Sequence, residues 1–353
     1  MTDVRISNPP PCNYPQSNPT AHDIRTELNG VAANRSKCTS FYLDTVEGMS
    51  NDIRSTEGED HHQGLARTHK LSDGSVHFFL SHSETDEGDQ GSLSVYRYAG
   101  PLDQEHPLQT SPLTVAPMKQ LLMIDEQHPS DITFLPDVNY PDAGYLFVTE
   151  EYVHHRLTVY AWNPSQGLAV KGRLSQGFPA GGPNFVFVDK VGEQYFLGIA
   201  SNNWGWGKLF QARDRDLFPK CEPGMMDVSA FQPVTPESFF PFPVIEGACQ
   251  NKLIQDATGN WYLLGFRSAP PDDPNGTDYV DLYHVSFSPF TISYRLDKVH
   301  IFFRPGDTGF ASTGTHYVEK SGRLLISSSY RWAEDEGPGN SGFVSRVDEC
   351  PSF

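Results

Sequence analysis

The chain has 353 residues, of which 37% are hydrophobic and 20% charged, and its formal net charge is −18 at pH 7. This composition supports a globular core, and no apolar run reaches the ~18–20 residues that a membrane-spanning helix needs, so we expect no membrane span. The acidic balance and the lack of a basic stripe exclude nucleic acid as a partner, because a polyanion would be repelled at long range.

Residues 1–39 form a predicted N-terminal extension without the apolar core of a signal peptide. The chain has five cysteines and no CxxC pair, so neither a zinc nor a redox motif is supported, and at least one thiol stays outside an intramolecular disulfide. Two sequons, at Asn34 and Asn275, together with four pairable cysteines favour a secreted or lumenal protein that carries N-glycans. Disulfide pairing and oligomeric state stay open.

Residues 40–353 are predicted to form one domain, an all-β propeller of five blades, because one pattern occurs five times. Each repeat has an apolar strand, a turn with glycine, a second strand, a polar loop and a third strand. The turn glycines lie 70, 48, 67 and 63 residues apart, which suits four-stranded blades; they are Gly74, Gly144, Gly192, Gly259 and Gly322. The stretch 213–245 shows no clean strand and is predicted to hold the most irregular blade; a sixth, degenerate blade is an alternative.

The outer strands are weaker in the sequence, with candidates at 106–115, 168–175 and 292–303. The fifth repeat ends near Val347 with three strands, and the run Ser40–Met49 before the first repeat is its predicted fourth strand. Such a strand would close the ring and remove its open edges. No window of twelve or more residues has the apolar period of a helix.

Polar side chains occur where each inner strand of the propeller is expected to begin, at 61–64, 128–131, 181–184, 248–251 and 311–315. In a propeller these segments converge on one mouth of the central channel, where polar groups must be solvated, mutually bonded or bound to a ligand. We therefore predict a small-molecule site at this mouth. The predicted catalytic residues are His62, His128 and Asp131. The predicted substrate-binding residues are His61, Gln63, Arg67, Asn184, Trp204, Trp206, Gln250, Asn251, Lys252, Arg267, Thr313 and Trp332.

The residue types in this ring favour proton transfer over hydrolysis. A glycosidase needs two carboxylates that flank the scissile bond, and Asp131 is the one acidic residue of the ring. No nucleophile elbow G-x-S-x-G occurs, and the spacing of the histidines does not confirm a metal site, so we expect no cofactor. An alternative left open is a single central cation bound by His61, His62, His128 and Asp131. Histidines transfer protons near neutral pH, amides orient a ligand, and Arg67 or Lys252 could stabilise an oxyanion. This set suits elimination, isomerisation or cyclisation of a largely neutral organic molecule.

Four segments are similar to parts of fungal and bacterial propeller proteins: HHQGLARTHK, GGPNFVFVD, SNNWGWGK and DYVDLYHV. Among fungal pathway proteins, residues 40–347 resemble the hetero-Diels–Alderases of tropolone–sesquiterpenoid biosynthesis. The resemblance implies dehydration of a hydroxylated tropolone to a quinone methide, then cycloaddition with a humulene-type alkene, without a cofactor. It carries no catalytic residue over to this chain.

Three hypotheses follow from the sequence. A cyclase or lyase acting on a neutral organic substrate predicts an apolar, aromatic-lined mouth around His62 and His128. A carbohydrate-active hydrolase or lyase predicts two carboxylates in one cleft. A sugar-binding lectin without catalytic activity predicts repeated shallow aromatic sites between the blades.

Overall fold

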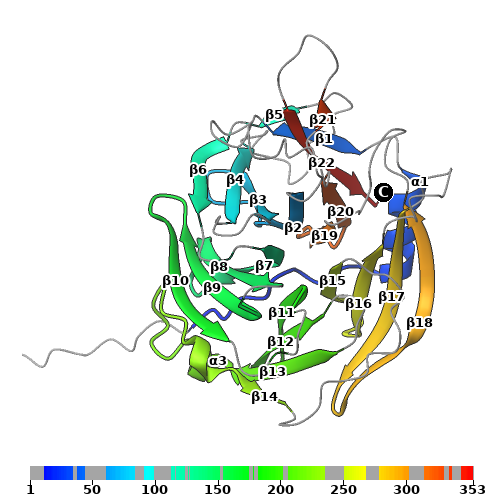
Figure 1. The fold of residues 1–353 in the computed structure, drawn as a ribbon. Coiled ribbons are helices and arrows are strands. Elements are labelled where there is room, and N and C mark those ends of the chain that lie inside the picture. The colour runs from blue at the N-terminus through cyan, green and yellow to red at the C-terminus, as the bar shows by residue number, and fades with distance from the viewer. Residues whose placement is uncertain are drawn as a thin grey trace, which may run out of the picture.

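The structure is a computed structural model in which five sheets stand around a central axis, so the prediction of an all-β, five-bladed propeller is confirmed (Figure 1). It describes residues 12–34, 38–43, 61–83, 91–98, 113–115, 117–123, 126, 128–151, 154–174, 178, 182–201, 206–234, 250–267, 278–301, 314–329, 334–335 and 343–352.

The first four blades are four-stranded sheets, and their strands follow one another in chain order from the axis outwards. Blade 1 consists of β2 (His61–Arg67), β3 (Val76–Ser83), β4 (Ser92–Tyr98) and β6 (Pro117–Met123). Blade 2 consists of β7 (Pro129–Asp137), β8 (Tyr140–Glu150), β9 (Arg156–Asn163) and β10 (Gly167–Leu174). Blade 3 consists of β11 (Phe185–Val191), β12 (Gln194–Ala200), β13 (Gly207–Arg213) and β14 (Gln232–Pro233). Blade 4 consists of β15 (Gln250–Gln255), β16 (Trp261–Arg267), β17 (Asp278–Phe287) and β18 (Phe290–Ile301).

Blade 5 is completed from the other end of the chain, as predicted. Its own strands are β19 (Gly314–Val318), β20 (Leu324–Ser329) and β22 (Phe343–Pro351), and the two-residue β21 (Glu334–Asp335) pairs with β22. The N-terminal strand β1 (Thr39–Leu43) pairs antiparallel with β22, and the disulfide Cys38–Cys350 lies beside this pairing. The ring is therefore closed by both hydrogen bonds and a covalent link.

The predicted outer strand 106–115 of blade 1 is wrong, because its last residues belong to blade 5. They form β5 (Leu113–Val115), which pairs parallel with β1, whereas the outer strand of blade 1 is β6. Blade 3 is the most irregular blade, as expected, since its outer strand β14 has two residues. After β13 it has the four-residue helix α3 (Asp214–Leu217) and the 3-10 turn η3 (Val228–Ala230).

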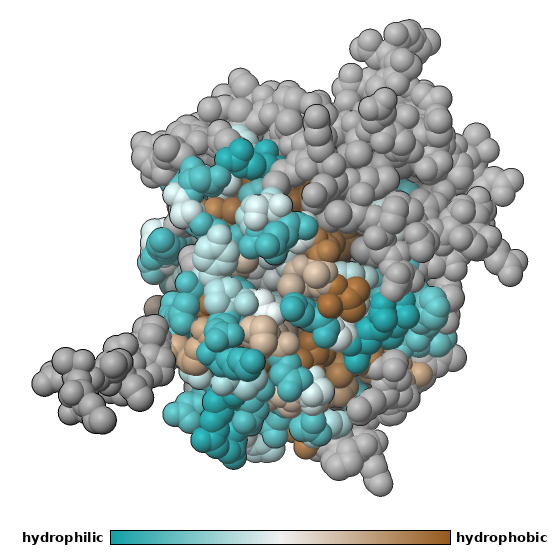
Figure 2. All heavy atoms as spheres, turned by 90° about the vertical axis from the view of Figure 1, so that its left-hand side faces the viewer, coloured by the Kyte–Doolittle hydropathy of each residue, from teal (hydrophilic) through white to brown (hydrophobic). Residues whose placement is uncertain are grey.

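Aromatic rings fill the spaces between blades. Phe79 of blade 1 stacks on Phe134 of blade 2, and both rings meet the edge of Trp162. In blade 3 the ring of Phe187 covers Gly198, where a Cβ atom would collide with it. Small and large residues thus alternate so that each sheet packs on its neighbour. The outer strand β10 turns a more polar side to solvent, and the side of the molecule in Figure 2 is mainly hydrophilic where it is coloured.

Residues 12–34 pack against the propeller and include a helix, α1 (Ile24–Ala33), that the sequence analysis did not predict. Asp23 caps its first turn, and Leu28 and Val31 join the apolar cluster between blades 4 and 5. At ten residues the helix is shorter than the window used for helical periodicity, although its spaced apolar residues and Asp cap are visible in the sequence. In the described part of the chain, no helix is long and apolar enough to cross a membrane.

Removal of the ring-closing disulfide is expected to destabilise the whole propeller. A Cys38→Ser/Cys350→Ser variant should lose about 2–4 kcal/mol of unfolding free energy, because the crosslink restricts the unfolded chain over nearly its full length. Urea unfolding followed by far-ultraviolet circular dichroism measures this loss. An unchanged midpoint in the double variant would show that the pairing of β1 with β22 closes the ring unaided.

Candidate functional site

One end of the central channel is covered by the N-terminal segment. We call the end where the five inner strands begin the upper mouth, and the end where they finish the lower mouth. Ser17 donates from its backbone N–H and its hydroxyl to Asp189 near the end of β11, and Asn18 accepts a hydrogen bond from the backbone N–H of Val318 at the end of β19. Ala21 donates to the carbonyl of Gln255 at the end of β15. A ligand that enters the channel therefore has the upper mouth available.

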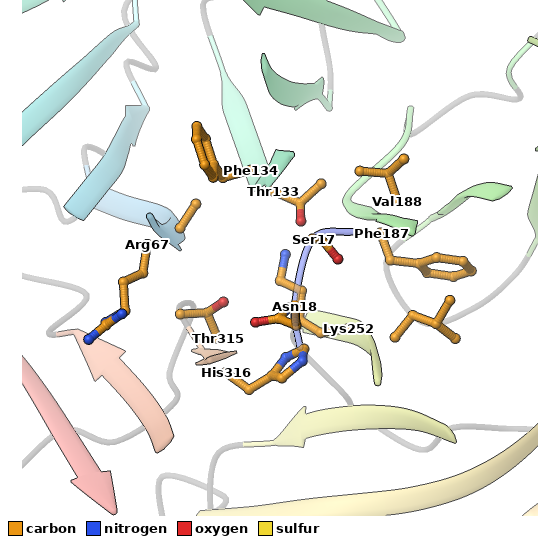
Figure 3. A pocket seen from close by; sticks show the side chains of 12 residues that line it. Ser17, Asn18, Arg67, Thr133, Phe134, Phe187, Val188, Lys252, Thr315 and His316 are labelled. Carbon is orange, nitrogen blue, oxygen red and sulfur yellow. The ribbon is translucent and has the colours of Figure 1, made fainter. Parts of the chain in front are cut away.

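The cavity that the structure describes between the inner strands is too small for a substrate. Between the inner strands lies a cavity of about 20 Å³, which is room for about one water molecule (Figure 3). Its polar lining includes Asn18, Thr133, Lys252, Thr315 and His316. An organic ligand larger than water therefore does not fit in this cavity.

Asp131 and Lys252, which the sequence analysis placed in the catalytic and substrate-binding sets, bind each other. The Lys252 ammonium lies 2.7 Å and 2.8 Å from the two carboxylate oxygens of Asp131 and donates to the carbonyls of Ile132 and Val186. Both side chains are almost completely buried. Asp131 also accepts backbone N–H groups of Ile132 and Val186. The pair joins the inner strands of blades 2, 3 and 4, and its hydrogen bonds are used in that contact.

Burial raises the pKa of the Asp131 carboxyl, and the Lys252 charge opposes that shift. Burial in turn lowers the pKa of Lys252 against the opposing effect of Asp131. The direct contacts to both carboxylate oxygens are those of an ion pair, and each charge is retained because the other is present. The pair is a structural ion pair that links the blades, and it is not turned towards a ligand.

Three predicted residues, Gln63, His128 and Gln250, form a hydrogen-bonded chain around the upper mouth. The Nε2 atoms of Gln63 and His128 are 2.7 Å apart, which links blade 1 to blade 2. The Gln250 side chain donates to the backbone carbonyl of Gln63 and accepts from the backbone N–H of Gly314, which links blades 4, 1 and 5. Asn251 follows Gln250 on β15. The structure thus brings Gln63, His128 and Gln250 together through hydrogen bonds.

Glu151 is a residue of this mouth that the sequence analysis missed. Its carboxylate lies 3.7 Å from His128 Nε2 and 3.5 Å from the Ser130 hydroxyl, and its backbone N–H donates to the carbonyl of His128. Glu151 is 4% exposed. It follows the second strand of blade 2, so its distance to the first strand could not be read from the order of residues. The signal for Glu151 available in the sequence was an acidic residue expected at the same end of blade 2 as His128.

Arg156 forms ion pairs with two neighbouring acids of blade 2, Glu150 and Glu126. Glu150 lies 3.0 Å from the Arg156 guanidinium and 2.8 Å from His154, and Glu126 lies 3.2 Å from Arg156. Glu126 also accepts hydrogen bonds from Thr158 and from the hydroxyl of blade 2's Tyr160. These contacts leave Glu151 as the blade 2 acid that faces His128.

Two other predicted ligand-binding residues serve the packing of blades. Arg67 is the last residue of β2, at the lower end of the strand, where it lies 2.8 Å from Glu349 and stacks on the Tyr317 ring. A buried guanidinium needs a buried carboxylate, and Glu349 supplies it. Trp206 is buried and stacks on Phe178 in the cluster of blades 2 and 3, so it presents no open aromatic face.

The remaining predicted residues are placed as follows. Asn184 is partly exposed directly before β11, and Arg267 is the last residue of β16 and partly exposed. His61 and His62 pair with Ser83 and His82 in the ladder of β2 and β3, and their side chains lie outside the description. Trp204, Thr313 and Trp332 lie outside the described residues. Among the residues that are described, no group of three His, Cys, Asp or Glu side chains could hold a metal ion.

Comparison with known proteins gives no family. No family model matches the chain, and no curated protein matches it in sequence. Solved structures of similar shape include a GH62 α-L-arabinofuranosidase catalytic domain from Coprinopsis cinerea, at 13% identity, with 89% of this chain and 98% of that chain covered and a TM-score of 0.47.

An α-L-arabinofuranosidase from Podospora anserina in complex with cellotriose matches at 11% identity, with 90% and 98% covered and a TM-score of 0.46. A GH43_1 enzyme from Xanthomonas citri matches at 12% identity, with 92% of each chain covered and a TM-score of 0.44. Likeness at this level says nothing about activity, and none of these matches supports the resemblance to hetero-Diels–Alderases.

The structural role of the Asp131–Lys252 ion pair can be tested by removing one of its two charges. Lys252→Met should cost about 3–5 kcal/mol of unfolding free energy, because it leaves the Asp131 carboxylate buried without its cation. Asp131→Asn/Lys252→Met should recover much of that loss, since the amide oxygen still accepts the backbone N–H groups. Urea unfolding of both variants measures the difference. Equal losses in the single and double variants would contradict the assignment.

The buried His316 makes stability depend on pH. Burial, with a smaller effect of the Lys252 charge, lowers the pKa of His316 from 6.5 to about 3. Between these values the unfolded chain binds a proton that the folded protein does not, so this histidine makes stability fall as the pH drops below 6.5. At about pH 5 the wild type should have lost about 2 kcal/mol more than a His316→Leu variant, relative to neutral pH. Urea unfolding at both pH values tests this, and equal losses would contradict it.

Proposed function

We propose that this protein is a carbohydrate-active enzyme that binds a saccharide at the upper mouth and uses His128 and Glu151 as its proton-transfer pair. The observation that carries the proposal is the contact of one ring nitrogen, His128 Nε2, with Gln63 at 2.7 Å and with Glu151 at 3.7 Å. All three residues come from the two blades on one side of the mouth.

The geometry supports a specific division of roles. With the Gln63 amide donating, His128 Nε2 is the acceptor and the proton of the neutral ring sits on Nδ1. A neutral imidazole of this tautomer can take a proton from a substrate at Nε2 when the substrate displaces the amide. The Glu151 carboxylate, on the same side of the ring, stabilises the imidazolium that then forms. This is the proton-transfer chemistry that the sequence favoured, with Glu151 in the role expected for Asp131.

The polarity of the mouth supports a hydroxyl-rich ligand. Its described lining consists of amides, hydroxyls, the His128 imidazole and the Glu151 carboxylate, with Gln63 and Asn184 partly exposed. Such groups satisfy sugar hydroxyls, which need both donors and acceptors. A cyclase of neutral terpenoids predicted an aromatic-lined mouth, but Trp206, one of the aromatics expected there, packs between blades 2 and 3. We therefore favour the carbohydrate alternative over dehydration and cyclisation.

The reaction class follows from the count of available acids. Glu150 and Glu126 are engaged by Arg156, and Asp131 by Lys252, so among the described acids at the upper end of blade 2 the carboxylate beside His128 is Glu151. A histidine–glutamate pair suits abstraction of a proton and elimination better than a displacement that needs two opposed carboxylates. We propose a lyase first, in which His128 takes the proton from the carbon next to a sugar carboxylate, the C–O bond to the leaving sugar breaks as a C=C bond forms, and the imidazolium returns the proton to the leaving oxygen. A hydrolase is the second candidate.

The experiment is a panel of neutral and uronate-containing oligosaccharides with two readouts, new reducing ends and the ultraviolet absorbance of an unsaturated sugar. Both reactions create a reducing end, and elimination alone creates the absorbance. His128→Gln and Glu151→Gln should each lower kcat/KM by about 10²–10⁴-fold, as expected for loss of acid–base catalysis.

The matched control is His22→Gln, which changes another histidine–glutamate pair at the lower end of the propeller, where His22 Nδ1 lies 3.0 Å from Glu27. It should retain full activity. Saccharide binding without either product would show a lectin instead of an enzyme. Full activity in both mouth variants would place catalysis elsewhere.

A further inference from the structure

Blade 4 carries a row of polar residues on the face that it turns towards blade 3. Asn251 of β15 is opposite Gly265 of β16, which is opposite Asp281 of β17, which in turn is opposite Lys298 of β18. Residues opposite each other in a sheet share one face. Two residues along each strand, Leu253, Leu263 and Tyr283 lie on that same face and pack in one cluster with Phe185 and Phe187 of blade 3. The row therefore faces blade 3, nearer the upper mouth than this cluster.

Two buried side chains of the row carry polar atoms without a hydrogen bond, although Oδ2 of Asp281 accepts one from the Tyr283 hydroxyl. Asn251 and Asp281 are both 0% exposed. Within the residues that the structure describes, both amide atoms of Asn251 and the Oδ1 atom of Asp281 lack a hydrogen-bond partner. A buried polar group without a partner costs about 1–3 kcal/mol. Such a cost at Asn251, in one row with an Asp281 oxygen that lies 3.5 Å from Arg295, indicates a place where a ligand supplies the missing groups.

The charge around this row is positive, although the chain as a whole carries −18. Three cations, Arg267, Arg295 and Lys298, lie close enough to Asp281 to oppose the rise of its pKa that burial causes. Arg295 lies 3.5 Å from the Asp281 carboxylate, and the Lys298 ammonium sits 3.6 Å from the centre of the Tyr279 ring.

Arg267 is on the same face as Gly265, two residues nearer the mouth, and is partly exposed. Over the described ranges it forms no ion pair. Three cations against one carboxylate leave an excess of positive charge, and a guanidinium matches the two oxygens of a carboxylate. The face thus combines a carboxylate receptor with amide groups that bind hydroxyls.

We infer that this polar face of blade 4, made of Asn251, Arg267, Asp281 and Lys298, is a binding site for a single uronate sugar unit. The uronate carboxylate pairs with Arg267 and Lys298, and the sugar hydroxyls bond to Asn251 and Asp281. The acidity of the whole chain disfavours a polyuronate, whose many charges would be repelled, so the site suits one acidic unit in a largely neutral saccharide. The inference concerns binding and does not depend on catalysis at His128.

The test is calorimetric titration with sodium D-glucuronate, D-glucose and sodium acetate at low ionic strength. Glucuronate should bind at least about tenfold more tightly than either glucose, which lacks the carboxylate, or acetate, which lacks the hydroxyls; tenfold corresponds to about 1.4 kcal/mol. Arg267→Gln should remove that preference. The control Arg97→Gln alters a half-exposed arginine that pairs with Asp73 on blade 1, and it should leave the affinity unchanged.

Asn251→Leu separates a binding role from a structural one. If Asn251 is kept for a ligand, the variant should unfold at an equal or higher urea concentration than the wild type, because it removes a buried unpaired amide, yet should bind glucuronate about tenfold more weakly. A structural asparagine would give a destabilised variant with unchanged affinity.

Three outcomes would overturn the inference: no preference for glucuronate over glucose, equal binding of acetate and glucuronate, or affinity unchanged in both Arg267→Gln and Asn251→Leu. His128→Gln should bind glucuronate as the wild type does. Loss of turnover with retained binding in that variant, or the reverse in Arg267→Gln, therefore distinguishes failure of one proposal from failure of the other.

Discussion

A ring of sheets is stable only when its first and last blades are joined, since an unjoined blade leaves backbone donors and acceptors without partners. In this protein β1 makes the join by pairing with β22 in blade 5, and the disulfide Cys38–Cys350 secures the same place. The strand β5, from the connection between β4 and β6, adds a parallel partner to β1. Blade 5 thus contains chain segments from both sides of the closure, and the convergence of the five inner strands on one mouth follows from it.

Much of the described axis of the ring is filled, which is why we propose ligand binding at the upper mouth. The Asp131–Lys252 ion pair spans blades 2 to 4, and the N-terminal segment covers the lower mouth through Ser17 and Asn18. The cavity left between them has room for about one water molecule. Several of the most polar inner-strand side chains therefore hold the blades together. The side chains at the start of the strands are the ones that we propose to face a ligand.

The two proposed sites at the upper mouth, at His128 and on the polar face of blade 4, are connected along one chain of hydrogen bonds. His128 contacts Gln63, whose carbonyl accepts from Gln250, and Gln250 precedes Asn251 of the blade 4 face. In the two proposals together, an acidic sugar is held at blade 4 while the reacting unit lies at blade 2. The positive charge of the blade 4 face then selects the substrate, and the His128–Glu151 pair transfers the proton.

The architecture could be predicted from the order of residues, because a blade is a local unit whose strands follow one another and whose turns need glycine, as at Gly74 and Gly322, both at positive φ. Of the residues predicted at the mouth, Gln63, His128 and Gln250 are joined by hydrogen bonds. The closing strand was predictable since the fifth repeat lacked one. The helix α1 was not predicted because its ten residues depend on packing against blades 4 and 5.

Only the tertiary structure decided which side chains are free to act. Asp131, Lys252 and Arg67 carry chemistry that a sequence marks as functional, yet each finds an opposite charge from another blade, and burial makes that pairing obligatory. Glu151 and Asp281 are functional candidates for the converse reason. The fold brings Glu151 beside His128 and Asp281 beside three cations. Charge pairing across blades depends on distances between segments far apart in the chain, and the order of residues does not contain those distances.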